Sequence, residues 1–235
     1  MDAVTRDDEP PWASGSFLAR ISPESRAELL ALGVTRRLTD GWHLLVEGKR
    51  DTHVEVIREG HVKVTTNTGG ASRLLAIRLP GDILGEFAAV TGNGRSATVT
   101  ACGEVVSTVI RQMDFLRFLG RHPGVANQVT ATVGERLRWA NDRRSDFAAF
   151  PVHVRLARVL GDIAESCGEA ACDGVLIGVR LNHTELATLV GAAEDTVQRS
   201  LRVLRERGLI RTGYSRITVL DPPGLRALVQ DAGEP

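Results

Sequence analysis

Hydrophobic residues change their spacing near residue 122, and this change limits the folds that the chain can adopt. From about residue 35 to 113 they occur in short runs, separated by turns such as Glu59-Gly60 and Pro80-Gly81-Asp82. Short runs between such turns are typical of an antiparallel β sandwich or barrel. Beyond residue 122 they recur every three, four or seven positions, at Val125, Val129, Val133, Leu137, Ala140 and Phe147. This spacing predicts one long helix that ends before Pro151.

The length of the chain favours two domains of modest size. It has 235 residues, of which 43% are hydrophobic, and this is enough for two folded cores. We expect an N-terminal arm at 1–20, a β domain at 21–121, the long helix at 122–150 and a second domain at 151–235. A long helix with a narrow apolar seam pairs with a second copy as a coiled coil, or packs on its own β domain, and the pattern leaves both open.

Charge and cysteine content narrow the class of protein. The formal net charge is zero, so a surface for nucleic acid has to come from local clustering of charge. Three cysteines, without the spacing of a metal site, and a polar, acidic N-terminus unlike a signal sequence together predict a cytoplasmic protein. Because no apolar stretch approaches the length needed to span a bilayer, a membrane protein is not expected.

The segment from Asn182 to Leu204 has the pattern of two short helices joined by a tight turn. Ala187 is a small residue midway along the first helix, where two crossing helices come close together. Gly191 stands at the turn, and Val197 is the apolar residue that would anchor the second helix. Strand-forming residues on both sides of Gly213-Tyr214 then predict a β wing. The pattern is that of a winged helix-turn-helix.

Arginines gather in this C-terminal segment, although the whole chain is neutral. They are Arg199, Arg202, Arg205, Arg207, Arg211 and Arg216. A local positive surface of this kind attracts the phosphates of DNA. A winged helix also serves in some proteins as a protein-interaction module, and arginines on helices are often only a solvated face. We favour DNA binding because Arg199 and the start of its helix together fit reading of a groove.

The order of these motifs resembles the cyclic-AMP receptor protein and fumarate-nitrate regulator (Crp/Fnr) family, from about residue 20 to 220. Residues 80–86 followed by 94–101 are similar to the phosphate-binding cassette of that family. The resemblance implies an α+β protein with a cyclic-nucleotide-binding β-barrel (jelly roll), a long dimerisation helix and a C-terminal winged helix-turn-helix. It also implies a homodimeric transcription regulator, not an enzyme, that binds a near-palindromic operator in double-stranded DNA. RNA polymerase is the further partner that it implies.

The cassette supplies groups that suit an anionic effector. A cyclic nucleotide, cAMP or cGMP, carries one delocalised negative charge, and Arg95 can pair with it through two hydrogen bonds. Ser96 adds a hydroxyl donor, and backbone N–H groups after Gly85 can point at the same anion. The resemblance implies that Glu86 accepts a hydrogen bond from the ribose 2′-hydroxyl. The alternative is that Arg95 pairs with Glu86 inside an empty barrel.

The effector site departs from the family pattern on the long helix. Relatives that bind cyclic AMP present a threonine, then serine or asparagine, to the adenine, and this chain has Ala140 and Asn141 after a matching Arg136. Asn141 can still hydrogen-bond a base edge across the dimer, whereas the side chain of Ala140 cannot. Weaker affinity for cyclic AMP, a different base, an unrelated anionic ligand or the absence of an effector therefore stay open.

The second helix of the helix-turn-helix also departs from the family pattern. Relatives have arginine and glutamate followed four residues later by arginine, whereas this chain has Glu194 and Asp195 and keeps Arg199. We expect Arg199 to read guanine through its N7 and O6 atoms, and Asp195 or Glu194 to accept from a cytosine amino group. The missing first arginine implies an altered half-site. Phosphate contacts that set the register are expected from His183, Thr184 and Thr196.

A metal-dependent barrel enzyme of the cupin kind is the main rival hypothesis. His43, His53, His61 and Glu55 all lie in the predicted strands. A metal site needs ligands that converge at one point, and these residues are spread over separate strands. This hypothesis also leaves the C-terminal domain unexplained, so we expect no metal.

Overall fold

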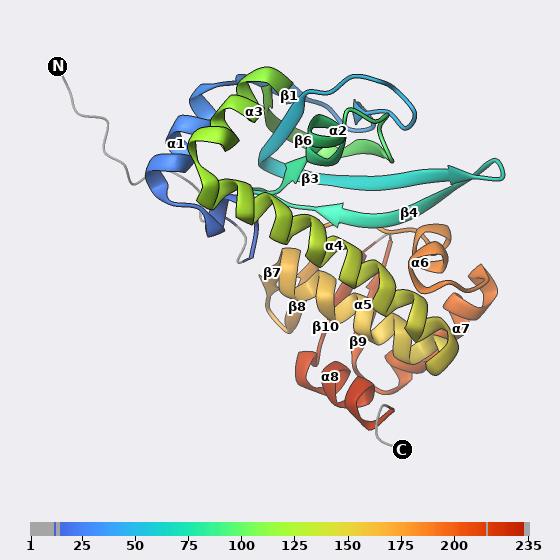
Figure 1. Cartoon of the computed structure of the whole chain (residues 1–235). Coiled ribbons are helices and arrows are strands. Elements are labelled where there is room, and N and C mark those ends of the chain that lie inside the picture. Colours follow the sequence, from blue (N-terminus) through green and yellow to red (C-terminus); the bar gives the residue numbers. More distant parts are fainter. Residues whose placement is uncertain (1–11, 13–14, 215, 233–235) are drawn as a thin grey trace.

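The computed structural model describes residues 12, 15–214 and 216–232, so most of the arm expected at 1–20 lies outside the described residues. The N-terminal part is built mainly of strands, the long helix α4 runs along it, and the C-terminal part lies on the other side of that helix (Figure 1). This arrangement confirms the predicted fold class of a β domain, a long helix and a winged helix-turn-helix.

The β domain begins with a 3₁₀ turn and a short helix. The 3₁₀ helix spans Leu18–Arg20 and helix α1 spans Pro23–Ala31. The Ser22 hydroxyl accepts a hydrogen bond from the backbone N–H of Ser25 at 3.2 Å and so caps the start of α1. Buried Leu29 fixes α1 to the core of the domain.

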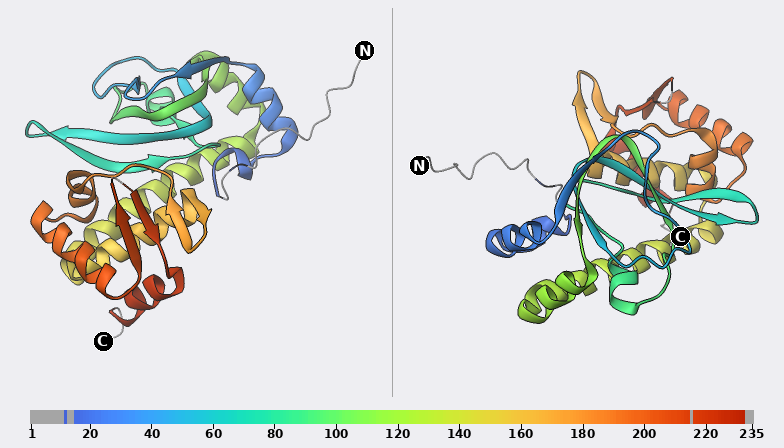
Figure 2. Two further views of the ribbon diagram at one scale, coloured as in Figure 1. Left: turned by 180° about the vertical axis from the view of Figure 1, so that it is seen from behind. Right: turned by 90° about the horizontal axis from the view of Figure 1, so that it is seen from above.

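Six antiparallel strands form the sheet of this domain. They are β1 (Val34–Leu38), β2 (His43–Leu45), β3 (Val54–Thr68), β4 (Ala71–Arg78), β5 (Ile83–Leu84) and β6 (Thr98–Ile110). The order is β1-β6-β3-β4, with β2 also on β6 and β5 also on β3. Strand β3 pairs with β5 near its start and with β4 near its end, and its register with β6 shifts between Ile57 and His61. Such shifts increase the twist, and the sheet curls (Figure 2).

Three further helices accompany the strands in this part of the chain. Helix α2 (Glu86–Thr91) lies between β5 and β6, α3 spans Gln112–Arg121, and α4 spans Pro123–Ala149. Helix α3 was not predicted from the sequence, although its Phe115 and Phe118 stand three residues apart and are both fully buried. Helix α4 confirms the long helix predicted from the apolar spacing.

The burial of the apolar seam of α4 differs between the two parts of the helix. Val125 and Val129 pack into the core of the β domain with Phe115 and Phe118. Farther along, Leu137 is 62% exposed and Phe147 is 42% exposed. The first part of the seam therefore packs on the chain's own domain, whereas the second part is open to solvent in the single chain.

The C-terminal domain combines four helices with a small antiparallel sheet. Its elements are α5 (Val152–Cys167), β7 (Gly168–Ala171), β8 (Gly174–Ile177), α6 (His183–Val190), α7 (Glu194–Glu206), β9 (Ile210–Gly213), β10 (Arg216–Val219) and α8 (Pro222–Asp231). The strand order is β7-β8-β10-β9. Strands β9 and β10 confirm the predicted wing. Strands β7 and β8 form a hairpin that was not predicted from the sequence. Helix α8, which Asp221 caps at the N–H of Gly224, was not predicted.

The hairpin of β3 and β4 reaches across to helix α6 of the C-terminal domain, as both views of the chain show (Figures 1 and 2). Lys63 Nζ lies 2.6 Å from Glu185 Oε1, and the N–H of Leu74 donates to Thr188 Oγ1 at 3.0 Å. Leu74 is buried with Leu186 and other core residues of the C-terminal domain. The two domains are therefore packed against each other.

None of the helices within the described residues is long and apolar enough to cross a bilayer.

Candidate effector cavity and DNA-binding surface

A cavity of about 540 Å³ lies between the β sheet and helix α4. Its walls include five of the six residues that the sequence predicted for the effector: Gly85, Glu86, Arg95, Ser96 and Arg136. Asn141 is exposed and does not line the cavity of the single chain, although its neighbour Ala140 does. The predicted contact of Asn141 with a ligand across a dimer stays a prediction.

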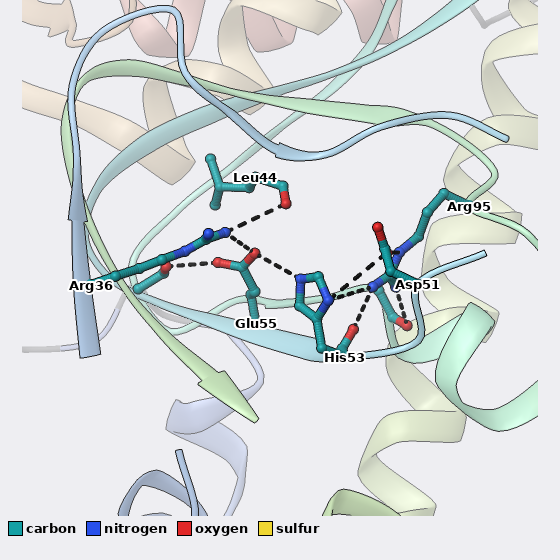
Figure 3. Close-up of polar contacts among 8 residues, drawn as sticks. Arg36, Leu44, Asp51, His53, Glu55 and Arg95 are labelled. Atoms are coloured by element: carbon teal, nitrogen blue, oxygen red, sulfur yellow. Dashed lines mark hydrogen bonds and ion pairs between the residues drawn. The ribbon is translucent and has the colours of Figure 1, made fainter. Parts of the chain in front are cut away.

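Arg95 is 4% exposed, and three groups fix its guanidinium at the cavity wall. Nε donates to Asp51 Oδ1 at 2.5 Å, Nη1 donates to the carbonyl of Gly85 at 3.1 Å, and Nη2 donates to the carbonyl of His53 at 2.7 Å (Figure 3). The alternative in which Arg95 pairs with Glu86 is wrong, because the carboxylate partner of Arg95 is Asp51. These contacts within the chain hold the guanidinium in one orientation.

Behind Arg95 lies a buried polar cluster that the sequence did not predict. Glu55 is fully buried, and its carboxylate receives hydrogen bonds from Arg36 and from the hydroxyl of Ser107, the latter at 2.7 Å. His53 Nε2 lies 3.2 Å from the same carboxylate, and His53 Nδ1 lies 3.3 Å from Arg95 Nη2 (Figure 3). The available signal was the spacing of Asp51, His53 and Glu55 at every second position, because alternate residues of extended chain point to the same side; Asp51 and His53 lie in the segment just before β3 and Glu55 lies within it.

This cluster also bears on the cupin hypothesis. His53 and Glu55 are hydrogen-bonded to Arg95, Arg36 and Ser107 rather than converging with other histidines. His43 hydrogen-bonds to Thr100 at 2.9 Å. In the part of the chain that the structure describes, no group of three or more histidine, cysteine, aspartate or glutamate residues is placed to hold a metal ion.

Glu86 and Arg136 join the cassette to the long helix. Glu86 is 5% exposed, and Arg136 Nη1 donates to its Oε1 at 2.7 Å. Arg136 Nη2 also donates to the carbonyl of Ile83 at 2.8 Å. A ligand that changed the position of the Glu86 carboxylate would therefore act directly on α4 through Arg136.

Gly85 allows Arg95 to lie where it does. Its φ of +76° is in the left-handed region, which favours glycine. A Cβ at this position would also lie 2.3 Å from Arg95 Nη1 and 3.0 Å from the carbonyl oxygen of His53. Gly85 is therefore required for both the turn and the close approach of the guanidinium.

The six predicted DNA contacts lie in the N-terminal halves of α6 and α7. Thr184 donates to Glu194 at 2.7 Å, and Arg199 folds along α7, where Nη2 donates to Thr196 Oγ1 at 3.2 Å. Asp195 is exposed, and its carbonyl accepts from Arg199 Nε at 3.3 Å. A residue that the sequence did not single out, Gln198, is exposed among them and lies 3.3 Å from His183 Nδ1.

Two of the six clustered arginines have carboxylate partners. Arg202 Nε lies 2.8 Å from Glu206 Oε1, and Arg211 pairs with Asp173 through two contacts. Arg205 donates to Thr212 at 3.2 Å. The positive charge of this surface is therefore smaller than the number of arginines suggests. Near the start of α7, Arg199 is exposed and contributes a positive charge.

Two family models match separate parts of the chain. The model described as Crp-like helix-turn-helix domain matches residues 154–228, and the model described as cyclic nucleotide-binding domain matches residues 35–122. The cavity lies mainly in the second of these regions, and the predicted DNA contacts lie in the first.

Curated proteins and solved structures agree with these matches. A cyclic AMP receptor protein from Thermus thermophilus is 28% identical over 201 residues, which cover 85% of this chain and 89% of the relative. The transcriptional regulator LdrP from the same organism is 30% identical over 165 residues, or 68% of this chain and 78% of the relative. A solved CRP/FNR-family regulator, also from Thermus thermophilus, is 25% identical with a TM-score of 0.68, covering 85% of this chain and all of that one.

Proposed function

The chain belongs to the Crp/Fnr family of transcription regulators, and from this membership we propose that it binds an operator with an affinity set by a cyclic nucleotide in the cavity beside α4. The observation that carries the effector part is Arg95, a buried guanidinium already oriented at the cavity wall by Asp51, Gly85 and His53. A preoriented guanidinium suits a phosphodiester because little side-chain entropy is lost on binding.

We further propose that the working form is a homodimer joined along α4. In the proposed mechanism the effector changes the relative free energies of two dimer arrangements, and one of these places the two α7 helices about one DNA turn apart. The break between α4 and α5 at Phe150 and Pro151 supports a hinge around residues 147–152. RNA polymerase is the partner proposed for the regulator on DNA, and the cytoplasm its location.

The effector proposal is tested by isothermal titration of the full chain with cyclic AMP and cyclic GMP. We expect saturable binding that Arg95→Ala abolishes, because Ala removes the oriented guanidinium that pairs with the phosphodiester at the cassette. Arg117→Ala, which removes an exposed arginine of α3, is the matched control and should bind normally. Binding that Arg95→Ala retains would contradict the assignment of this cavity.

The DNA proposal is tested by fluorescence anisotropy against a library of half-sites. If Arg199 reads a guanine, Arg199→Ala should cost about 1 to 3 kcal/mol at one base position and little at the others. Arg226→Ala on α8, where Arg226 contacts Glu165 at 2.9 Å, is the control. An equal loss on all sequences would show that Arg199 contacts phosphate instead.

A further inference from the structure

The walls of the effector cavity carry far more positive charge than one phosphodiester needs. Among the residues that the structure describes, Glu86 is the one acidic residue that lines the cavity. Six arginines line it as well: Arg73 and Arg78 from β4, Arg95, and Arg136, Arg143 and Arg144 from α4. The formal net charge of the whole chain is zero, so this excess is local.

Two of the six arginines are neutralised within the chain. Arg95 pairs with Asp51 at 2.5 Å and Arg136 pairs with Glu86 at 2.7 Å. Across residues 12, 15–214 and 216–232, no carboxylate forms an ion pair with the other four, Arg73, Arg78, Arg143 and Arg144. We call these four the second arginine group.

Two members of the second arginine group are withdrawn from water. Burial, with a further contribution from Arg136, lowers the pKa of Arg78 to about 10, and burial lowers the pKa of Arg143 to about 10. Arg78 donates to the carbonyl of Ile77 at 3.1 Å, and Arg143 donates to that of Leu75 at 3.1 Å. A backbone carbonyl does not neutralise a cation. Attraction to these arginines would therefore stabilise an anion bound here.

Nearby carboxylates are already engaged. Asp146, which faces Arg143, holds Arg158 at 2.6 Å, and burial raises the pKa of Asp162, whose carboxylate accepts a hydrogen bond from Trp139. Asp82, which faces Arg78, accepts a hydrogen bond from the N–H of Leu79 at 3.0 Å. The positive charge of the second arginine group is therefore only partly offset.

The second arginine group extends the charge of the cavity away from the cassette. Arg136 and Arg143 stand seven residues apart on α4, about 10 Å along the helix axis and on nearly the same face. Arg143 lies against β4, and its guanidinium carbon is 4.3 Å from the ring centre of Trp139. Phe147 and Thr188 of α6 also line this region.

Resting on the proposed function, we propose that the effector carries two separated anionic groups, one at Arg95 and Ser96 and the other at the second arginine group. A cyclic dinucleotide has two phosphodiesters and fits this requirement, whereas cyclic AMP and cyclic GMP each have one. Its second base can pack on Trp139. Because Thr188 belongs to the DNA-binding domain and accepts from Leu74 of β4, such a ligand bridges the two domains.

The test is isothermal titration of the full chain with cyclic di-GMP, cyclic di-AMP, cyclic AMP and cyclic GMP. A dinucleotide should bind at least about tenfold more tightly than either mononucleotide, since it makes additional charge-assisted hydrogen bonds. Arg143→Gln and Arg144→Gln should each weaken dinucleotide binding about tenfold and leave any mononucleotide binding nearly unchanged. Arg138→Gln, on the same helix but outside the lining, is the control.

Arg143→Gln and Arg144→Gln together distinguish a lost ligand contact from a structural change in the protein. Arg143 also joins α4 to Leu75, whereas Arg144 is exposed, so an effect of Arg144→Gln cannot come from a loosened contact with β4. Tight mononucleotide binding without dinucleotide binding would overturn this inference and leave the proposed function standing. Dinucleotide binding that Arg95→Ala abolishes and both glutamine variants retain would also overturn it. No binding of any of the four ligands would overturn both proposals.

Discussion

The effector site depends on residues that fix Arg95 as much as on Arg95 itself. Asp51 and His53 hold the guanidinium from one side, and the carbonyl of Gly85 holds it from the other. Glu55 lies behind His53 and is fully buried; Arg36 compensates its charge, and the hydroxyl of Ser107 donates a hydrogen bond to it. The orientation of one ligand-binding side chain is thus set by a chain of hydrogen bonds that reaches into the core of the sheet.

Gly85→Ala tests this dependence on close packing. Gly85 and Gly92 stand before and after helix α2 with φ of +76° and +71°, but a Cβ at Gly92 would meet nothing within 4 Å. Both alanine variants carry a backbone cost of about 1 kcal/mol, and Gly85→Ala additionally displaces Arg95. We expect Gly85→Ala to lose effector binding and Gly92→Ala to keep it, as measured by titration. Equal affinities would show that Arg95 relaxes without loss.

At the scale of elements, the β3–β4 hairpin connects effector cavity and DNA-binding domain. The same hairpin lines the cavity through Leu74 and Leu75 and contacts α6 through Lys63 and Leu74. Glu185, the partner of Lys63, also accepts the N–H of Asn182 at 2.9 Å in the capping box of α6. The position of the first helix of the helix-turn-helix is therefore coupled to the strand that forms one wall of the cavity.

Lys63→Met should loosen this contact while leaving the cap of α6 intact. Loss of a partly exposed ion pair of this kind costs up to about 1 kcal/mol, which corresponds to amide exchange in α6 that is about fivefold faster. Hydrogen–deuterium exchange across residues 183–190 measures it. Lys49→Met, at an exposed lysine near the cassette, is the control and should leave α6 unchanged. Unchanged exchange in Lys63→Met would mean that this ion pair adds nothing measurable to the packing of Leu74 and its hydrogen bond to Thr188.

At the scale of the whole molecule, the single chain leaves part of α4 uncovered. Leu137 is 62% exposed on a helix whose earlier residues Val125 and Val129 are buried in the β domain. The exposed segment is part of the predicted dimer seam, and a Cβ added at Gly134 there would meet nothing within 4 Å. A second copy packed along this segment would bury Leu137 and would bring Asn141 toward the partner's cavity.

Leu137→Glu should therefore separate the proposed dimer. A carboxylate buried in an apolar seam without a partner is strongly unfavourable, so the variant should sediment as a monomer at micromolar concentration and lose operator affinity. Leu116→Glu places the same charge on an exposed leucine of α3 and should leave the wild-type assembly intact. A wild-type chain that sediments as a monomer would contradict the dimer itself.

The sequence by itself determined the elements whose pattern is local. Helical spacing predicted α4, and turn residues predicted the helix-turn-helix and the wing, because periodicity and turn propensity depend on neighbouring residues. Helices α3 and α8 and the β7–β8 hairpin were not predicted, although local signals were present for the two helices.

Only the tertiary structure decided which distant residues meet. Arg95 and Asp51 are 44 positions apart, and Lys63 and Glu185 are 122 positions apart. No local pattern ranks Asp51 above Glu86 as the partner of Arg95, and none brings the arginines of β4 and α4 to one cavity. The halves of α4 carry the same apolar spacing, yet one half is buried and the other is not. Spacing selects the conformation of a segment, whereas burial and charge pairing depend on what the rest of the chain places beside it.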